Sequence, residues 1–281
     1  MRIVEKIKII TDSTSDLPKN IIEQYDIEVL PLMVSFGDES FEDGVDIKLY
    51  DLLRKIDEQG IFPTTSQVNP QKFAECYQSY LSQGYKIISI HISSKMSGTY
   101  QSACIAKEMI ESEDIIVIDS LNVTAGLGLL VMKACTLNEK GHQLKFIESE
   151  ILKLRPKVRS ALGFERLDNL VKGGRLSRTA GIIGNILGIK PILAIKDGEM
   201  AVIDKVRGSK KAVRTILDYI DTNGIKDHEL CFLLYVENED ILTTLRENLN
   251  SKGIRYIEGE VGCVVGVHAG KNACGIFFIG N

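Results

Sequence analysis

An apolar run at residues 87–92 is followed by a polar turn containing Ser97 and Gly98, and then by a helical pattern. In an open α/β sheet, ligands bind beyond the carboxyl ends of the strands. Ser97 occupies a position suited to a helix N-cap, and Gly98 lets another group approach the backbone closely. The free N–H groups of such a helix start favour an anion. The turn therefore either holds an anionic ligand or is an ordinary helix cap formed by Ser97.

Two further side chains can take part in binding an anion. Thr65 lies in the hydroxyl-rich stretch 62–69, which is interpreted as an irregular connection and is either a binding loop or a solvated turn. His268 follows the apolar run 263–267, interpreted as a strand, and has glycines on both sides. A nearby carboxylate favours the charged imidazole, which makes His268 a partner for an anion near neutral pH. The alternative is a histidine that is hydrogen-bonded within the structure.

A glycine pair at 173–174 interrupts a helical pattern and is followed by Arg175 and Arg178. Ser177 can cap a new helix over residues 177–187, so both arginines crowd a helix N-terminus, where the macrodipole disfavours cations. An anion is therefore expected nearby, and it is either a carboxylate of the protein or a phosphate.

The elements that must position these residues alternate in the first half of the chain. Strands alternating with helices of this length predict a mostly parallel sheet covered on both faces. Pro18 suits the first turn of the first helix. The predicted strands are residues 8–11, 29–36, 87–92 and 115–118. A first helix is predicted to begin at residues 16–18, and further helices are predicted over 47–56, 70–80, 98–110 and 123–138.

The second half has a different pattern. Asp197-Gly198 between apolar stretches 189–195 and 200–206 is a strong hairpin signal. A chain of 281 residues is long for one compact core, so two packed domains are expected. We predict an α/β (Rossmann-like) domain at 1–160 and an α+β domain at 161–281. The further elements expected there are helices at 210–219 and 240–249 and strands at 230–236, 256–258, 263–267 and 275–279.

Composition argues against several classes of function. A net charge of −4 with no basic stripe argues against nucleic acid as a partner. No segment approaches the roughly 20 apolar residues that span a bilayer, and the charged N-terminus does not resemble a signal peptide. Six scattered cysteines without a CxxC pair fit small buried hydrophobes in a reducing cytoplasm. With four histidines and no HxH or HxxxH spacing, neither a metal site nor another cofactor is expected.

Together these segments resemble the DegV family of bacterial fatty-acid-binding proteins. The similarity extends over nearly the whole chain and keeps the family's order, so the set is specific although each motif is short. One departure is Lys95, where many relatives have glycine. The matching motifs are Thr11-Asp12-Ser13 with Asp16-Leu17, Thr65-Ser66-Gln67, Ser93-Ser94 with Ser97-Gly98-Thr99-Tyr100, Asp119-Ser120, Lys172-Gly173-Gly174-Arg175-Leu176-Ser177 and Gly266-Val267-His268-Ala269-Gly270.

The resemblance implies a two-domain α/β protein with a lipid tunnel between and within its domains. It implies that Thr65, Ser97, His268 and the Gly98 N–H hold the carboxylate of a long-chain fatty acid. The family presents this carboxylate to a separate ATP-dependent fatty acid kinase, which makes an acyl phosphate for phospholipid synthesis. Arg175 would then lie near the phosphorylation site and Arg207 on the surface that meets the kinase. On this interpretation the chain is not itself an enzyme, and it contacts membrane surfaces transiently to exchange lipid.

Two other interpretations compete with the carrier. The first is an acyl hydrolase with Ser97 as the nucleophile and His268 as the base. It lacks a G-x-S-x-G elbow, and only Asp12 or Asp119 is available to orient the histidine. The second is a small-molecule sensor or interaction module, which would leave the Arg175 loop without a phosphate to bind.

Overall fold

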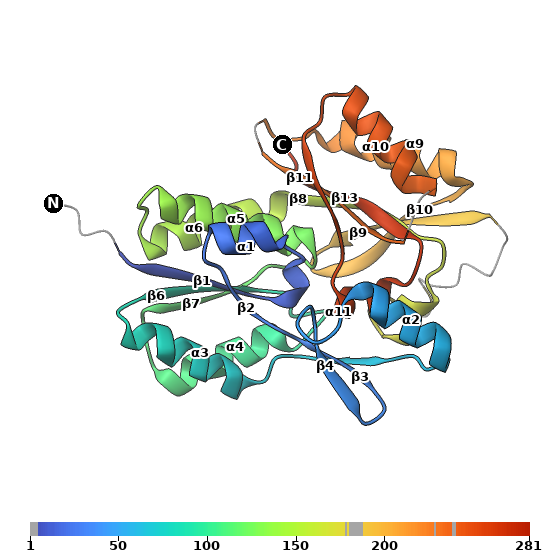
Figure 1. Cartoon of the computed structure of the whole chain (residues 1–281). Helices are drawn as coiled ribbons and strands as arrows, with labels where there is room; N and C mark the ends of the chain where they lie inside the picture. The colour runs from blue at the N-terminus through green and yellow to red at the C-terminus, as the bar shows by residue number, and fades with distance from the viewer. Residues whose placement is uncertain (1–4, 178, 180–187, 228, 238–239) are drawn as a thin grey trace.

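The computed structural model describes residues 5–177, 179, 188–227, 229–237 and 240–281 (Figure 1). Its strands form a four-stranded, a six-stranded and a three-stranded sheet. Arg178 and most of the helix predicted over 177–187 lie outside the described residues.

The four-stranded sheet has the order β2-β1-β6-β7 and is parallel throughout. Helices α3 and α4 cover one face, and α5 and α6 cover the other (Figure 1). This arrangement confirms the predicted parallel sheet with helices on both sides. The bounds are β1 Ile7–Asp12, α1 Lys19–Gln24, β2 Glu28–Leu30, α3 Pro70–Ser82, β6 Lys86–His91, α4 Thr99–Ile110, β7 Ile115–Asp119, α5 Ala125–Glu139 and α6 Leu144–Leu154.

The single strand predicted over 29–36 is wrong, because the chain leaves the parallel sheet at Pro31. Proline has no N–H to donate and interrupts a strand ladder. The second part, β3 (Met33–Phe36), instead pairs antiparallel with β4 (Glu39–Glu42) and β5 (Thr64–Ser66). Strand β5 lies inside the stretch predicted to be irregular, so Thr65 is a strand residue opposite Val34. Between β4 and β5 runs α2 (Leu49–Gln59), which overlaps the predicted helix.

The six-stranded sheet has the order β10-β9-β8-β13-β11-β12. Its mixed parallel and antiparallel pairing agrees with the expected α+β character, and the predicted hairpin at Asp197-Gly198 joins β9 to β10. Helices α9 and α10 pack against it (Figure 1). The division into domains at residue 160 remains a prediction, and it falls within β8. The bounds are β8 Val158–Gly163, α7 Asp168–Lys172, β9 Ile189–Lys196, β10 Glu199–Arg207, α9 Ser209–Asn223, β11 Cys231–Val236, α10 Asp240–Ser251, β12 Tyr256–Glu260 and β13 Ala273–Ile279.

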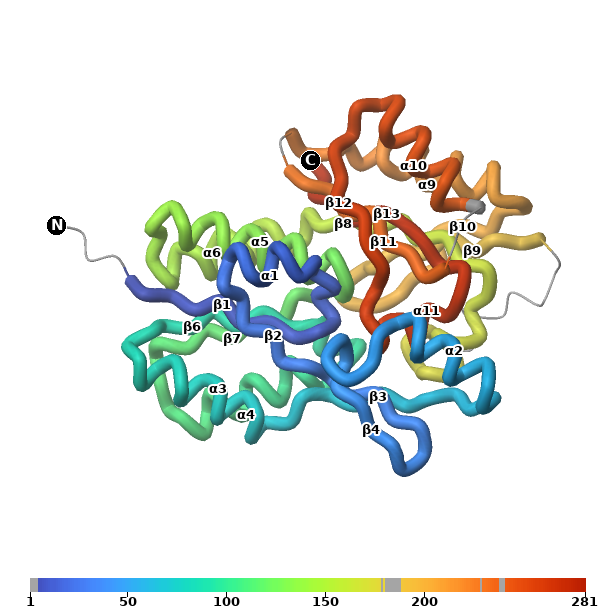
Figure 2. Tube along the Cα trace, in the orientation of Figure 1, coloured from blue at the N-terminus to red at the C-terminus, as the bar shows by residue number. Residues whose placement is uncertain are grey.

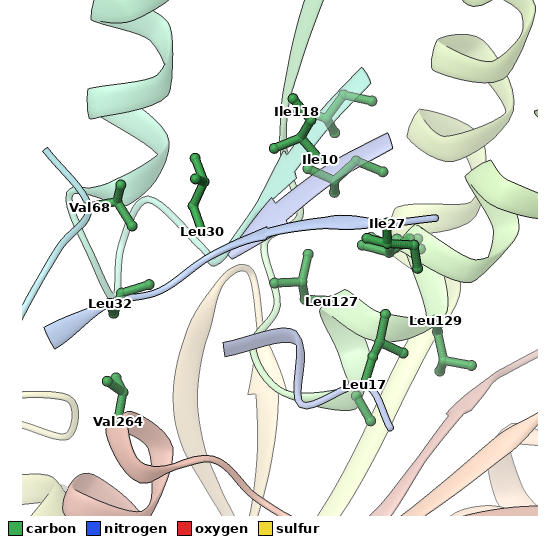
Figure 3. Close-up of a cluster of buried hydrophobic side chains, with 14 of the residues drawn as sticks. Ile10, Leu17, Ile27, Leu30, Leu32, Val68, Ile118, Leu127, Leu129 and Val264 are labelled. Carbon is green, nitrogen blue, oxygen red and sulfur yellow. The ribbon is translucent and has the colours of Figure 1, made fainter. Parts of the chain in front are cut away.

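Helix α5 joins the two large sheets. It contacts β1 and β6 of the parallel sheet and also β8 and β13 of the six-stranded sheet. Ten of its 15 residues are buried, as expected for a helix that is apolar on all sides. Leu127 and Leu129 of α5 belong to one core cluster with Ile10 of β1 and Val264 near the end of the chain (Figure 3).

The strand predicted at 263–267 is also wrong. Residues Cys263–Ala269 form helix α11, which begins after the N-cap Gly262 and ends at Gly270 with a φ of +72°. A short apolar run does not distinguish a strand from a buried helix, which explains the error. In the sequence α11 comes between β12 and β13 of the six-stranded sheet. In space it packs beside α2, β3 and β5 (Figure 1 and Figure 2).

A glycine in the central strand β13 is required by close backbone contact. A Cβ at Gly275 would lie 2.4 Å from the Ala161 carbonyl oxygen and 2.7 Å from the Leu162 Cα. We expect Gly275→Ala to lower the free energy of unfolding by about 1–3 kcal/mol, measured by urea denaturation. Gly259→Ala in β12 is the control, because its Cβ would meet only Leu234 Cδ2 at 3.7 Å. Equal stability of the two variants would contradict this explanation.

Candidate ligand-binding site

A cavity of about 890 Å³, including its opening to solvent, lies where the two large sheets and α11 meet. Most of its wall is apolar and comes from segments far apart in the sequence. Representative apolar residues are Leu32, Ile92, Leu162, Val236, Val264 and Phe277.

Four of the predicted site residues, Thr65, Ser97, Arg175 and His268, line this one cavity. Thr65 Oγ1 and His268 Nε2 are 2.9 Å apart and form a hydrogen bond between residues 203 positions apart in the chain. Strand β5 presents the threonine, and the last turn of α11 presents the histidine. The structure thus gathers hydroxyl, imidazole and guanidinium groups in an otherwise mostly apolar cavity.

Ser97 and Gly98 occupy the start of α4, but their roles differ from the expected ones. Gly98, not Ser97, is the N-cap residue. The Ser97 hydroxyl oxygen accepts a hydrogen bond from the Thr99 N–H at 3.3 Å and lies 2.9 Å from the Thr99 hydroxyl. Within the described chain, no group accepts a hydrogen bond from the Gly98 N–H. Gly98 is not among the residues that line the cavity, whereas Ser97 is.

Gln67 is a site residue whose position sequence reasoning did not reveal. A Cβ on Gly98 would lie 1.9 Å from Gln67 Oε1, so only glycine leaves room for this amide. The Gln67 Nε2 donates a hydrogen bond to Ser102 Oγ at 2.8 Å, which ties the end of β5 to α4. The sequence feature that could have indicated Gln67 is its place in the Thr65-Ser66-Gln67 motif, two residues after Thr65.

Arg175 is partly buried beside the cavity. Its Nε donates to the Met96 carbonyl oxygen at 3.0 Å, and its Nη1 donates to the Gly173 carbonyl oxygen at 2.5 Å. Burial lowers the pKa of the guanidinium. No acidic side chain in the described ranges forms an ion pair with Arg175. The sequence predicted either a carboxylate of the protein or a phosphate near this loop, and the described residues do not provide that carboxylate. An anionic ligand would offset the desolvation of this charge.

His268 is neutral at physiological pH. Burial, followed by the positive charge of Arg175, lowers the pKa of the imidazole from 6.5 to about 4. The charged form expected from the sequence therefore requires a carboxylate beside the ring, which would raise the pKa again. His268 Nδ1 is buried without a hydrogen-bond partner in the described structure. It rests against Gly173, where a Cβ would lie 2.1 Å from Nδ1.

The hydrogen bonds around Ser97 do not form the relay of a serine hydrolase. Asp12 Oδ2 is 3.0 Å from His91 Nδ1, and Asp119 accepts hydrogen bonds from backbone N–H groups. Neither carboxylate is paired with His268, whose Nε2 is hydrogen-bonded to Thr65. The acids considered as orienting groups are thus engaged elsewhere.

Arg207 lies apart from these residues. It is the exposed last residue of β10 and is not among those lining the cavity. In the described part of the chain, no cluster of three or more histidine, cysteine or acidic residues suited to a metal ion is found. None of the described helices has the length and apolar character needed to span a bilayer.

Comparison with known sequences identifies the family. The sequence model of the DegV family, described as uncharacterised proteins, matches residues 6–281. The chain belongs to the DegV family. A DegV domain-containing protein of Clostridium acetobutylicum is 61% identical over 276 residues, covering 98% of this chain and 99% of the relative. A second from Clostridium perfringens is 49% identical over 276 residues, covering 98% and 99% of the two chains.

Solved structures with the same fold include several that are described as fatty-acid-binding proteins. A DegV family protein from Thermus thermophilus, described by its fatty acid binding, superposes with a TM-score of 0.91 at 31% identity, covering 98% of this chain and 100% of the other. A stearic acid-binding protein from Eubacterium ventriosum superposes with a TM-score of 0.87 at 28% identity, covering 98% of each chain. The mixed α/β DegV fold expected from the resemblance is therefore confirmed, whereas its division into two domains stays a prediction.

The lowered pKa of His268 gives a direct test. Because the pKa of His268 is lower in the folded state, the unfolded protein takes up a proton on this side chain at a higher pH than the folded protein does. The free energy of unfolding should therefore fall as the pH is lowered from about 6.5 to about 4. We expect the His268 ring in ligand-free protein to titrate near pH 4 by NMR, with its signal assigned through His268→Gln. Titration near 6.5 would contradict the burial described here.

Proposed function

We propose that this DegV protein is a carrier that encloses a long-chain fatty acid and holds its carboxylate with Thr65, Ser97, His268 and the Gly98 N–H. The observation that carries the proposal is the single cavity in which a mostly apolar wall meets the Thr65–His268 pair, Ser97 and Arg175. An amphiphile with one anionic end is the ligand class that such a cavity fits. The fatty acid binding described for the Thermus thermophilus and Eubacterium ventriosum proteins supports it.

The energetics also favour such a ligand. At about 0.8 kcal/mol per buried CH₂, a chain of about 16 carbons gains on the order of 12 kcal/mol before ordering costs are subtracted. A carboxylate carried into an apolar cavity is strongly disfavoured unless donors meet it. The hydroxyl, imidazole and amide groups near Ser97 provide these donors.

We further propose that the protein acts as the substrate carrier of a separate ATP-dependent fatty acid kinase. Arg175, without an acidic partner in the described chain, would face the carboxylate as it becomes an acyl phosphate for phospholipid synthesis. The exposed Arg207 would belong to the surface that meets the kinase. In this scheme the protein works in the cytoplasm, performs no chemistry itself and touches membrane surfaces only to exchange lipid.

The head-group assignment predicts lipid loss on removal of each donor. Native mass spectrometry should find fatty acid on wild-type protein purified without added lipid. Thr65→Ala, Ser97→Ala and His268→Ala should each weaken binding by about tenfold or more, since a hydrogen bond to a charged group contributes roughly 1.5–3 kcal/mol. Ser82→Ala, at the exposed end of α3, is the control and should bind normally. Unchanged retention in all three site variants would reject the assignment.

The carrier assignment predicts a separation of binding from transfer. With the purified kinase and ATP, Arg175→Ala and Arg207→Ala should lose most acyl phosphate formation while retaining fatty acid, because neither arginine is assigned to hold the chain. Arg255→Ala, at an exposed position before β12, should behave as wild type. Loss of lipid retention in the two arginine variants would instead assign them a structural role.

A further inference from the structure

Two aspartates meet at the start of α11. Asp16 Oδ1 accepts a hydrogen bond from the Gly262 N–H at 2.8 Å, and Asp43 Oδ1 accepts one from the Cys263 N–H at 2.7 Å. A Cβ on Gly262 would lie 2.8 Å from Asp16 Oδ1 and within 3.3 Å of both Asp43 oxygens. The two carboxyl groups therefore converge on one glycine, and a side chain at that position would collide with both.

Their remaining oxygens differ. Asp43 Oδ2 accepts a hydrogen bond from Ser13 Oγ at 2.8 Å, and Ser13 Oγ in turn accepts from the Leu32 N–H at 3.1 Å. Asp16 Oδ2 is buried and has no hydrogen-bond partner in the described chain. Because two carboxylates side by side do not both ionise readily, this free oxygen is where a proton is best held.

Helix α11 connects this pair to the ligand site. Two turns or fewer separate Gly262 from His268, and Val264, Val265, His268 and Ala269 all line the cavity. Asp16 and Asp43 belong to the first sixth of the chain, whereas α11 comes from near residue 265. The two aspartates thus connect α11, which forms part of the cavity wall, to the segments that follow β1 and β4.

We propose that Asp16 is a positioning residue for the ligand site: in its neutral form it holds the start of α11 together with Asp43, and loss of its proton loosens that helix and weakens fatty acid binding. The inference rests on the proposed carrier function. Asp16 touches no ligand in this scheme and acts through the helix that presents His268.

The charges around the pair support this assignment. Burial, then the charge of Asp43 and more weakly that of Asp12, raises the pKa of Asp16 well above its ordinary value, against the lowering effect of the Gly262 N–H. Burial also raises the pKa of Asp43 and that of the neighbouring Cys263 thiol, the latter to about 12. No lysine, arginine or histidine of the described residues forms an ion pair with either aspartate.

The sign of the pH dependence follows. A carboxyl group whose pKa is higher in the folded state stabilises that state below its ordinary pKa, and this stabilisation is lost as the pH rises through the folded-state pKa. Asp16→Asn keeps the shape of the side chain and is neutral at every pH. The variant should therefore be insensitive to this titration.

The test compares wild type, Asp16→Asn, Asp43→Asn and the exposed control Asp38→Asn between about pH 5 and pH 10. Affinity is measured with cis-parinaric acid, and the ratio of each variant to wild type removes the titration of the probe and of His268. As the pH rises, we expect the affinity of wild type and of Asp38→Asn to fall about tenfold relative to that of Asp16→Asn. Asp43→Asn should lie between them, because burial still raises the pKa of the remaining Asp16 carboxyl group.

Urea denaturation of lipid-free protein over the same range separates the two proposals. If no protein binds cis-parinaric acid at any pH, the carrier function fails, and the denaturation series alone then decides the role of Asp16. The Asp16 assignment requires that Asp16→Asn becomes progressively more stable than wild type as the pH rises. The assignment would be wrong if the affinity and the free energy of unfolding depended on pH in the same way in wild type and in Asp16→Asn.

Discussion

Four aspartates hold the backbone around the cavity by accepting hydrogen bonds from main-chain N–H groups. Asp12 binds the N–H groups of Thr14 and Ile92, and Asp119 binds those of Ser94 and Leu121. Asp16 and Asp43 do the same for the start of α11. A buried main-chain N–H without an acceptor is costly, and these carboxyl oxygens supply the acceptors. These hydrogen bonds fix the loops around the cavity relative to one another, although the loops come from distant parts of the chain.

The parallel sheet could be predicted from the sequence because its signals are local. The strand at 87–92, the helix after it and the Asp197-Gly198 hairpin all appear where periodicity and turn residues indicate them. The errors fall where a tertiary contact overrides a short pattern. Pro31 diverts an apparently continuous strand into a second sheet, and the run at 263–267 is helical because it packs against α2 and β3.

The candidate site could be predicted as a set of residue types but not as a geometry. The strand–turn–helix pattern indicated Ser97 independently of any relative, whereas Thr65 depended on family resemblance. No local pattern predicts that Thr65 meets His268 across 203 residues, or that the imidazole is neutral because it is buried beside Arg175. Both facts arise from the return of α11 into the first half of the molecule, which is a property of the whole chain.

The central position of β13 has a consequence for how the protein is made. This strand, Ala273–Ile279, pairs with β8 on one side and β11 on the other. A ribosome must therefore deliver residues up to 279 before the six-stranded sheet can close, and until then the edges of β8 and β11 that face β13 are unpaired. Pairings between such distant segments form slowly, and exposed strand edges invite aggregation. The nascent chain therefore exposes unpaired strand edges until β13 has been made.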